Sequence, residues 1–391
     1  MKRGGVKLKA VLVVLVVAGA YAAYRGYELV SFRQALRAAE AAIERRDFKT
    51  AGTHLEKCLT LQPQDPALRL LAARTARRRS DFETARRELK TFAQLNGSEA
   101  ERRLELQLID IQVGIDRAAT DRLLESCLAD PRKPETDLIL EVVIADEVKN
   151  LELAYNSGMT LVEGPAGALR EKTEKAIALW MEHRPGSADR AQGSYWRGRI
   201  RALLSPQAAL EDYRAALAAD PDHFDARLHL AAALGETDPR EAAEHLERLR
   251  LREPNHEPVR LLLAYTRRSL GQLTEAQRLL DEILAANPKH PAALVERGKT
   301  ALDAGRFEES AEFLQRALAV APNEPFIHLA LSRALHLAGR EAEAKVHQQR
   351  YSEIESERLR SERLRSDEER AAWRKRLEME LIRKETAPKN P

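Results

Sequence analysis

A chain of 391 residues, only 5% of them aromatic, is too long for one compact core, but its length suits a stacked array of small units. Charged residues make up 32% of the chain, yet their signs nearly cancel to a net charge of +3. This balance disfavours nucleic-acid binding, which normally requires one strongly basic face. Two cysteines form no disulfide framework, and we interpret Cys58 and Cys127 as small core residues.

The N-terminus combines a basic segment, residues 1–9, with an almost entirely apolar run over residues 10–24. Because positive residues stay on the cytoplasmic side, we expect residues 1–9 in the cytoplasm and the rest of the chain across the membrane. We interpret residues 10–30 as an uncleaved transmembrane signal-anchor, since no proline interrupts residues 21–46. A cleaved signal peptide followed by secretion is the alternative. The sequence therefore predicts a single-pass membrane protein with an extracytoplasmic (periplasmic) remainder.

Similar segments follow one another in residues 32–133. The sequence Asp47–Ala51 has a close copy in Asp81–Ala85, with leucines at helical spacing behind each copy. A third segment keeps Gly114 and Pro131 but loses the aromatic residue. Each segment is interpreted as a pair of helices.

The pattern breaks in residues 134–189, which are about twenty residues too long for one such unit. This block still ends in a helical pattern, with Pro185 in the terminating position. We interpret it as an enlarged, divergent repeat between an N-terminal and a C-terminal half of the array. Its extra loop either contacts a partner or is a tolerated surface insertion.

Regular order returns in residues 190–351, where prolines recur at a constant interval at Pro254, Pro288 and Pro322. A small residue precedes each proline by the same number of positions, at Ala242, Ala276 and Ser310. This interval and its small-residue and proline positions resemble the tetratricopeptide repeat, in which each unit is an antiparallel helix pair. The resemblance extends over residues 32–351 and is strongest in 224–324. One such hairpin cannot bury both its apolar stripes alone, so neighbours must stack.

The end of the chain changes character. Residues 352–385 alternate glutamate and arginine and predict a long, charged, solvated helix, while residues 386–391 predict a disordered tail. Trp373, Leu377 and Leu381 stand four apart within this helix. Such a stripe can cap the last repeat, dock on a partner or pair with itself. The predicted fold is therefore an all-α, right-handed α-α solenoid of about nine hairpins, preceded by a membrane helix and followed by a charged helix.

Motifs for catalysis are not found. The histidines are scattered without metal-ligand spacing, and the chain has no glycine-rich phosphate loop, no nucleophile elbow and no Cys-X-X-Cys pair. Carboxylates alternate with arginines and are interpreted as helix surface. The sequence thus predicts a protein that is not an enzyme and has no cofactor, no metal and no small-molecule substrate.

In the family that this sequence resembles, the first helix of each unit lines a concave groove that holds an extended peptide or a partner helix. Repeat alignment places eight candidate residues there: Arg74, Arg77, Arg78, Tyr265, Arg268, Lys299, Arg333 and His336. Arginine in the groove can bind carboxylates with two parallel hydrogen bonds, and Tyr265 offers a flat apolar contact. The asparagine with which some members clamp a terminal carboxylate is missing at the equivalent positions.

We therefore predict a membrane-anchored scaffold that binds a protein or peptide partner in its groove, as a helper of assembly, secretion or maturation. One alternative is a self-assembling structural protein that uses the C-terminal helix. Another is the regulatory subunit of an enzyme system whose catalytic part is a separate chain.

Overall fold

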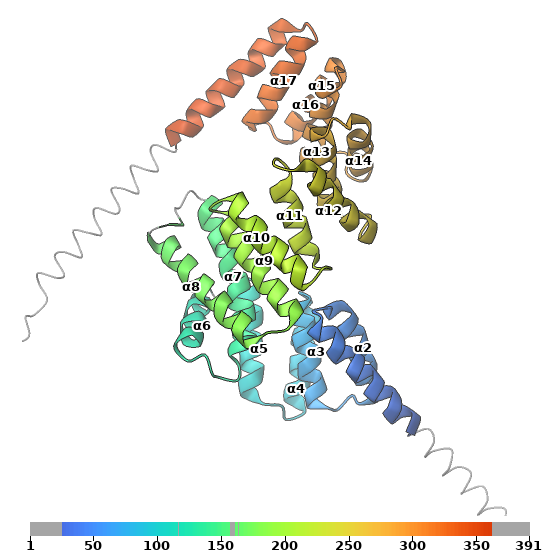
Figure 1. Cartoon of the computed structure of the whole chain (residues 1–391), viewed down its shortest axis with the longest axis vertical. Helices are drawn as coiled ribbons and strands as arrows, with labels where there is room; N and C mark the ends of the chain where they lie inside the picture. Colours follow the sequence, from blue (N-terminus) through green and yellow to red (C-terminus); the bar gives the residue numbers. More distant parts are fainter. Residues whose placement is uncertain (1–25, 116, 157–160, 163, 362–391) are drawn as a thin grey trace, which may run out of the picture. The chain divides into compact units, whose positions relative to one another are not determined.

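The computed structural model describes residues 26–361, apart from residue 116, residues 157–160 and residue 163 (Figure 1). Within this part of the chain the regular elements are helices and no strand occurs, so the all-α class is confirmed. The chain divides into two compact units, residues up to Ala226 and residues from Arg227, and the division falls within α11 (Phe224–Leu234). The domain limits predicted from the sequence stay a prediction.

The N-terminal unit is a series of helical hairpins in which each labelled helix packs on the next. Helices α5, α7 and α9 also contact one another in turn, as expected when hairpins stack. After a helix over residues 26–44, the elements are α2 (Phe48–Leu61), α3 (Pro66–Arg78), α4 (Phe82–Gln94), α5 (Glu99–Gln112), α6 (Arg117–Ala129), α7 (Thr136–Asn156), α8 (Gly164–His183), α9 (Ser187–Ala202) and α10 (Pro206–Ala219).

The recurring aspartate of the first repeats marks where helices begin. The side chain of Asp47 accepts a hydrogen bond from the Thr50 amide, and that of Asp81 accepts one from the Thr84 amide. Each carboxylate thereby satisfies an amide that has no partner inside the helix. Asp65 does the same at α3, where Pro66 occupies the first helical position. These caps explain why the aspartate is repeated in the sequence.

The divergent block of residues 134–189 consists of α7 and α8, which have 21 and 20 residues, whereas α3, α4 and α6 have 13 each. Much of its additional length therefore lies in the helices themselves. Trp180 of α8 is 1% exposed and packs against Trp196 of α9, with 5.0 Å between the ring centroids. Both cysteines are free and buried, as predicted.

The C-terminal unit continues with α12 (Pro239–Arg252), α13 (Glu257–Ser269), α14 (Leu273–Ala286), α15 (Pro291–Asp303), α16 (Phe307–Val320), α17 (Pro325–Leu337) and a helix over residues 341–361. Helix α13 contacts α15, and α15 contacts α17, so the first helices of successive hairpins form one layer. Gly271 and Gly305 adopt positive φ angles of 72° and 73° between the two helices of their hairpins, a conformation that suits glycine.

We expect Gly298→Ala to destabilise the C-terminal unit by about 1–3 kcal/mol, since overpacking a close helix contact costs that much. A Cβ atom at Gly298 would lie 2.7 Å from Cγ of Leu314, so the Leu314 side chain would have to shift or α15 and α16 would have to separate. Urea denaturation measures the effect. Gly26→Ala, where a Cβ meets nothing within 4 Å, is the matched control. Equal urea midpoints for the two variants would contradict this account of the hairpin.

The predicted single-pass membrane protein is contradicted. Between residues 26 and 361, in the parts described, no helix combines the length and the apolar character that a bilayer crossing needs. Even the 21 residues of α7 include Asp137, Glu141, Asp146 and Glu147, which are costly to place in hydrocarbon. The apolar run on which the expectation rested, residues 10–24, lies outside the described residues, as do residues 362–391 with the predicted Trp373 stripe.

Candidate functional site

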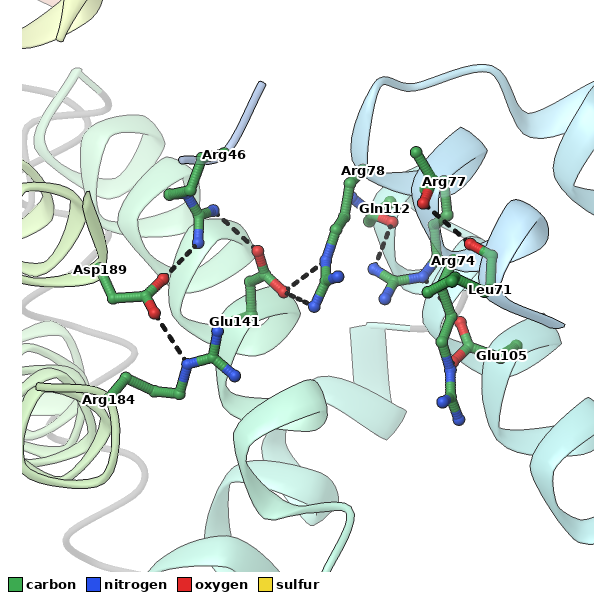
Figure 2. A network of polar contacts seen from close by, with 11 residues as sticks. Arg46, Leu71, Arg74, Arg77, Arg78, Glu105, Gln112, Glu141, Arg184 and Asp189 are labelled. Atoms are coloured by element: carbon green, nitrogen blue, oxygen red, sulfur yellow. Dashed lines mark hydrogen bonds and ion pairs between the residues drawn. The ribbon is translucent and has the colours of Figure 1, made fainter. Parts of the chain in front are cut away.

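Two of the three arginines predicted on α3 are engaged by one buried carboxylate. Arg77 is 1% exposed, and its Nε donates to Oε2 of Glu105 over 2.9 Å. Arg74 donates from Nε to the other oxygen of Glu105 over 2.7 Å, and Nη1 of Arg77 also donates to Gln112. Glu105 lies on α5 and is itself 1% exposed. Arg77 is therefore a buried structural group that ties α3 to α5 (Figure 2).

A second network joins residues that are far apart in the sequence (Figure 2). Glu141 of α7 accepts from Nη2 of Arg46 at 2.7 Å and from Nε of Arg78 at 2.9 Å. Arg46 also donates from Nη1 to Asp189 at 3.1 Å, and Asp189 accepts from Nε of Arg184 at 2.9 Å. Two carboxylates thus bridge three guanidinium groups, which charge-assisted hydrogen bonds hold in place.

The network acts on the ionisation of Glu141. Burial disfavours its carboxylate, but the charges of Arg78, Arg46 and Arg77 outweigh burial and lower the pKa from 4.5 to about 2. Glu141 is therefore ionised at neutral pH although it is buried.

Arg46 stands in an unfavourable backbone conformation. Its φ of 58° is left-handed, in the turn two residues before a helix where Gly271 and Gly305 stand in the C-terminal unit. Its guanidinium lies 5.4 Å from the ring centroid of Phe48 and 5.7 Å from that of Trp180. A non-glycine residue in this conformation costs free energy, which the ion pairs and ring contacts of the Arg46 side chain help to offset.

Sequence reasoning missed the residues that complete this network: Arg46, Glu141, Arg184 and Asp189. One pattern could have indicated Arg46, because later repeats have glycine in the same turn. Nothing in the periodicity identifies the other three.

Beside the networks lies a cleft of about 740 Å³ formed by α3, α5, α6, α7 and α8. Its volume falls within the range of small-molecule and peptide sites. Part of the lining is apolar and comprises Leu71, Leu104, Leu123, Leu138, Ile139 and Trp180. The charged part comprises Arg74, Arg78, Lys133, Arg184, Glu101, Glu135, Asp137 and Glu141. The cleft thus combines an apolar surface with charged groups of both signs.

Arg184 presents two terminal nitrogens to this cleft as hydrogen-bond donors. Its side chain is 40% exposed, and in the described part of the chain only its Nε takes part in an ion pair. Its two terminal nitrogens are therefore available to a ligand. Cys127 also lines the cleft, but burial raises the pKa of its thiol to about 11, so it stays protonated and poorly nucleophilic at neutral pH.

In the C-terminal unit the predicted residues of α13 and α15 lie together. Arg268 pairs with Glu296 at 3.2 Å and with Asp303 at 2.9 Å, and its guanidinium lies 5.5 Å from the Tyr265 ring centroid. Lys299 donates to Glu296 at 2.9 Å. Arg268 and Lys299 thus share Glu296 of α15, and the Tyr265 ring lies against the guanidinium of Arg268.

The two predicted residues of α17 stand apart from this group. His336 pairs with Glu341 at 2.6 Å, and both side chains are exposed. Arg333 is exposed and makes no ion pair or hydrogen bond through its side chain within the described residues. Whether the eight residues predicted from the sequence bind a partner stays a prediction.

A metal centre is not evident in what the structure describes, where no group of three or more His, Cys, Asp or Glu residues could hold an ion. The expectations that the chain is not an enzyme and needs no cofactor stay predictions.

The chain matches known families in its C-terminal unit. One family model described as tetratricopeptide repeat matches residues 233–295, and a second model of the same description matches residues 291–324. No curated protein matches the chain. Solved structures similar to it include MamA, residues 41 to the end, from Desulfovibrio magneticus RS-1, with 20% identity, a TM-score of 0.39 and coverage of 43% of this chain and 97% of that one. Another is MamA AMB-1, with 26% identity, a TM-score of 0.36 and coverage of 42% and 98%.

TM-scores this low support no conclusion about fold or function. The family-model matches fall on the same proline interval and the same helix pairs that the structure places in α12 to α16. Residues 233–324 therefore consist of tetratricopeptide repeats.

Proposed function

We propose that this chain is a protein-interaction scaffold and that the cleft of its N-terminal unit holds a segment of a partner polypeptide. The segment carries a carboxylate next to an apolar side chain. One observation supports this choice most: the terminal nitrogens of Arg184, which make no ion pair in the described residues, line the same cleft as several leucines. A guanidinium binds a carboxylate with two parallel hydrogen bonds, and the leucines remove an apolar side chain from water.

The neighbouring arginines play a different part in this proposal. Arg78 is held by Glu141, and Arg74 is held by Glu105, so both guanidinium groups are fixed in place and their charge is balanced by these carboxylates. A ligand therefore meets preorganised groups, which lowers the entropic cost of binding. Arg77 does not line the cleft and takes no part in recognition.

The test is a library of random peptides displayed on phage and selected on the full-length chain. We expect enrichment of aspartate or glutamate beside leucine, isoleucine or phenylalanine. Arg184→Ala should weaken the selected peptides about tenfold, the loss of roughly 1.4 kcal/mol that one charged hydrogen bond supplies. Leu104→Ala, on the apolar wall, should weaken them as well.

Arg190→Ala is the matched control, because Arg190 is exposed on α9, has no side-chain ion pair in the described residues and does not line the cleft. The Arg190→Ala variant should bind the selected peptides with the affinity of the wild type. Peptides that bind the wild type and both cleft variants equally would exclude this site, and thermal melts would confirm that each variant is folded.

A further inference from the structure

The last described hairpin of the C-terminal unit consists of α17 and the helix over residues 341–361, which we call the terminal helix. Leu331 and Leu335 of α17 pack in one buried cluster with Ala344 of the terminal helix. Oγ of Ser332 also donates to the carbonyl of Ala344 over 2.9 Å. Beyond this hairpin the described chain contains no further repeat. A repeat with a neighbour on only one side opens at a lower free energy than an inner repeat.

Two histidine rings meet where the terminal helix packs on α17. Nδ1 of His328 lies 3.1 Å from Nδ1 of His347, and Nε2 of His328 lies 3.0 Å from the carbonyl oxygen of Pro322. His328 is 5% exposed, and His347 is half-buried. Because a carbonyl oxygen only accepts, Nε2 of His328 carries the hydrogen of the neutral ring, and its Nδ1 is an acceptor. Nδ1 of His347 is therefore the donor, and one hydrogen lies between the two rings.

This arrangement limits how many protons the docked pair can hold. One extra proton can enter at Nε2 of His347 and leaves the bond between the rings intact. A second proton would have to enter at Nδ1 of His328, where it would face the hydrogen of His347 and place two positive rings in contact. Once separated and in water, both imidazoles take up a proton near about pH 6.5. The separated helices thus bind one proton more than the docked helices, so acid favours separation.

The nearest carboxylate only partly opposes this effect. Glu343 lies one turn before His347 on the terminal helix, and its charge favours the protonated ring. Both of its oxygens, however, accept from Arg340, at 2.8 and 2.7 Å. Burial and the charge of His328 outweigh Glu343, so the pKa of His347 is lower than its usual 6.5.

The other charged groups at this contact are engaged elsewhere or exposed. His336 of α17 pairs with Glu341 of the terminal helix at 2.6 Å, and protonation strengthens this pair. Both side chains are exposed, so its contribution to docking is small. On α16, which also packs on α17, Glu308 pairs with Arg340. Within the described residues no carboxylate forms an ion pair with either ring of the buried pair.

We propose that the His328–His347 pair makes the last hairpin acid-sensitive: it holds the terminal helix on α17 at neutral pH and releases it as the pH falls below about 6.5. Release exposes the buried side of α17 that carries Leu331 and Leu335. Because most helical stability comes from packing, the backbone amides of the released helix then exchange with solvent. The contact lies in the C-terminal unit and involves no residue of the cleft, so either proposal can fail without the other.

Hydrogen exchange of the full-length chain, followed by mass spectrometry at pH 7 and pH 5, tests the proposal. Exchange times are scaled for the intrinsic effect of pH on amide exchange. We expect the opening constant of amides 344–349 to rise about twentyfold, the response to one excluded proton with a pKa of about 6.5. Helix α14 contains no histidine and is the internal reference, so its opening constant should change much less.

His347→Asn is the decisive variant. The amide nitrogen of asparagine takes the place of Nδ1, does not titrate, and can donate to neutral His328. Its oxygen can instead accept from protonated His328, so the helix stays docked in acid and most of the pH response should disappear. His336→Asn removes the other histidine of this contact and should keep the full response. An unchanged response in His347→Asn, loss of the response in His336→Asn, or an equal rise in α14 would overturn the proposal.

A second measurement does not depend on the variants. Nuclear magnetic resonance of the full-length chain with isotope-labelled histidine follows the protonation of each imidazole directly. We expect the second protonation of the pair to occur below pH 6.5 and together with the loss of amide protection in residues 344–349. Two protonations at or above pH 6.5, with the terminal helix still protected, would contradict the proposal.

Discussion

Glu105→Leu is expected to destabilise the N-terminal unit by about 4 kcal/mol, because removing one partner of a buried ion pair leaves the other charge uncompensated. The charge left behind is Arg77, which is 1% exposed and would keep only Gln112 as an acceptor. Arg74 would lose Glu105 as well, but it keeps Glu101 at 3.5 Å, and its side chain is 29% exposed. Urea denaturation followed by circular dichroism measures the loss.

The double variant Arg77→Met/Glu105→Leu distinguishes the stability lost through an unpaired charge from the stability lost through poorer packing. Replacing both charges with apolar groups of similar size removes the unpaired charge, so most of the lost stability should return. Glu99→Leu is the control on the same helix, because Glu99 is solvent-exposed and its pairs with Arg102 and Arg103 lie at the surface. A double variant as unstable as Glu105→Leu alone would show that the cost lies in the shape of the site rather than in its charge.

Glu141→Gln is expected to lower the free energy of unfolding by roughly 3 kcal/mol at pH 7, the value that corresponds to a pKa lowered from 4.5 to about 2. Glutamine keeps the shape of the side chain but has no charge for Arg46 and Arg78, whose side chains are only 19% and 16% exposed. Glu141→Gln therefore weakens the contact between the turn at Arg46 and helix α7.

The pH dependence of this variant follows from the direction of the shift. A carboxyl whose pKa is lower in the folded chain stabilises it above the unfolded pKa, and this stabilisation disappears as the pH falls toward about 2. The difference between wild type and Glu141→Gln should thus shrink to less than about half between pH 7 and pH 3. Denaturation curves at both pH values measure it, and a difference independent of pH would disprove the ionised form of Glu141.

Several features of this protein follow from neighbouring residues and could therefore be predicted from the sequence. Asp47 and Asp81 cap the helices that follow them, since a carboxylate three residues before an amide reaches it within one turn. Pro288 and Pro322 stand just past the second helices of their hairpins, where a residue without an amide hydrogen ends a helix. Apolar stripes at helical spacing identified the repeat and its core, including the buried Ala276 and Leu279.

The membrane prediction rested on the local hydropathy of residues 10–24. It was contradicted, because no helix in the described part of the chain is both long and apolar enough to cross a bilayer. Local hydropathy measures only how apolar a run is.

Residue order alone was enough to predict the helices and their repetition, because helical periodicity and the prolines that end helices involve residues less than about two turns apart. The partners of Arg77 and Arg46 became known only from the folded chain: Glu105 holds Arg77 across 28 positions, and Asp189 holds Arg46 across 143. A guanidinium pairs with whichever carboxylate folding brings within about 3 Å, and sequence periodicity carries no information about that distance.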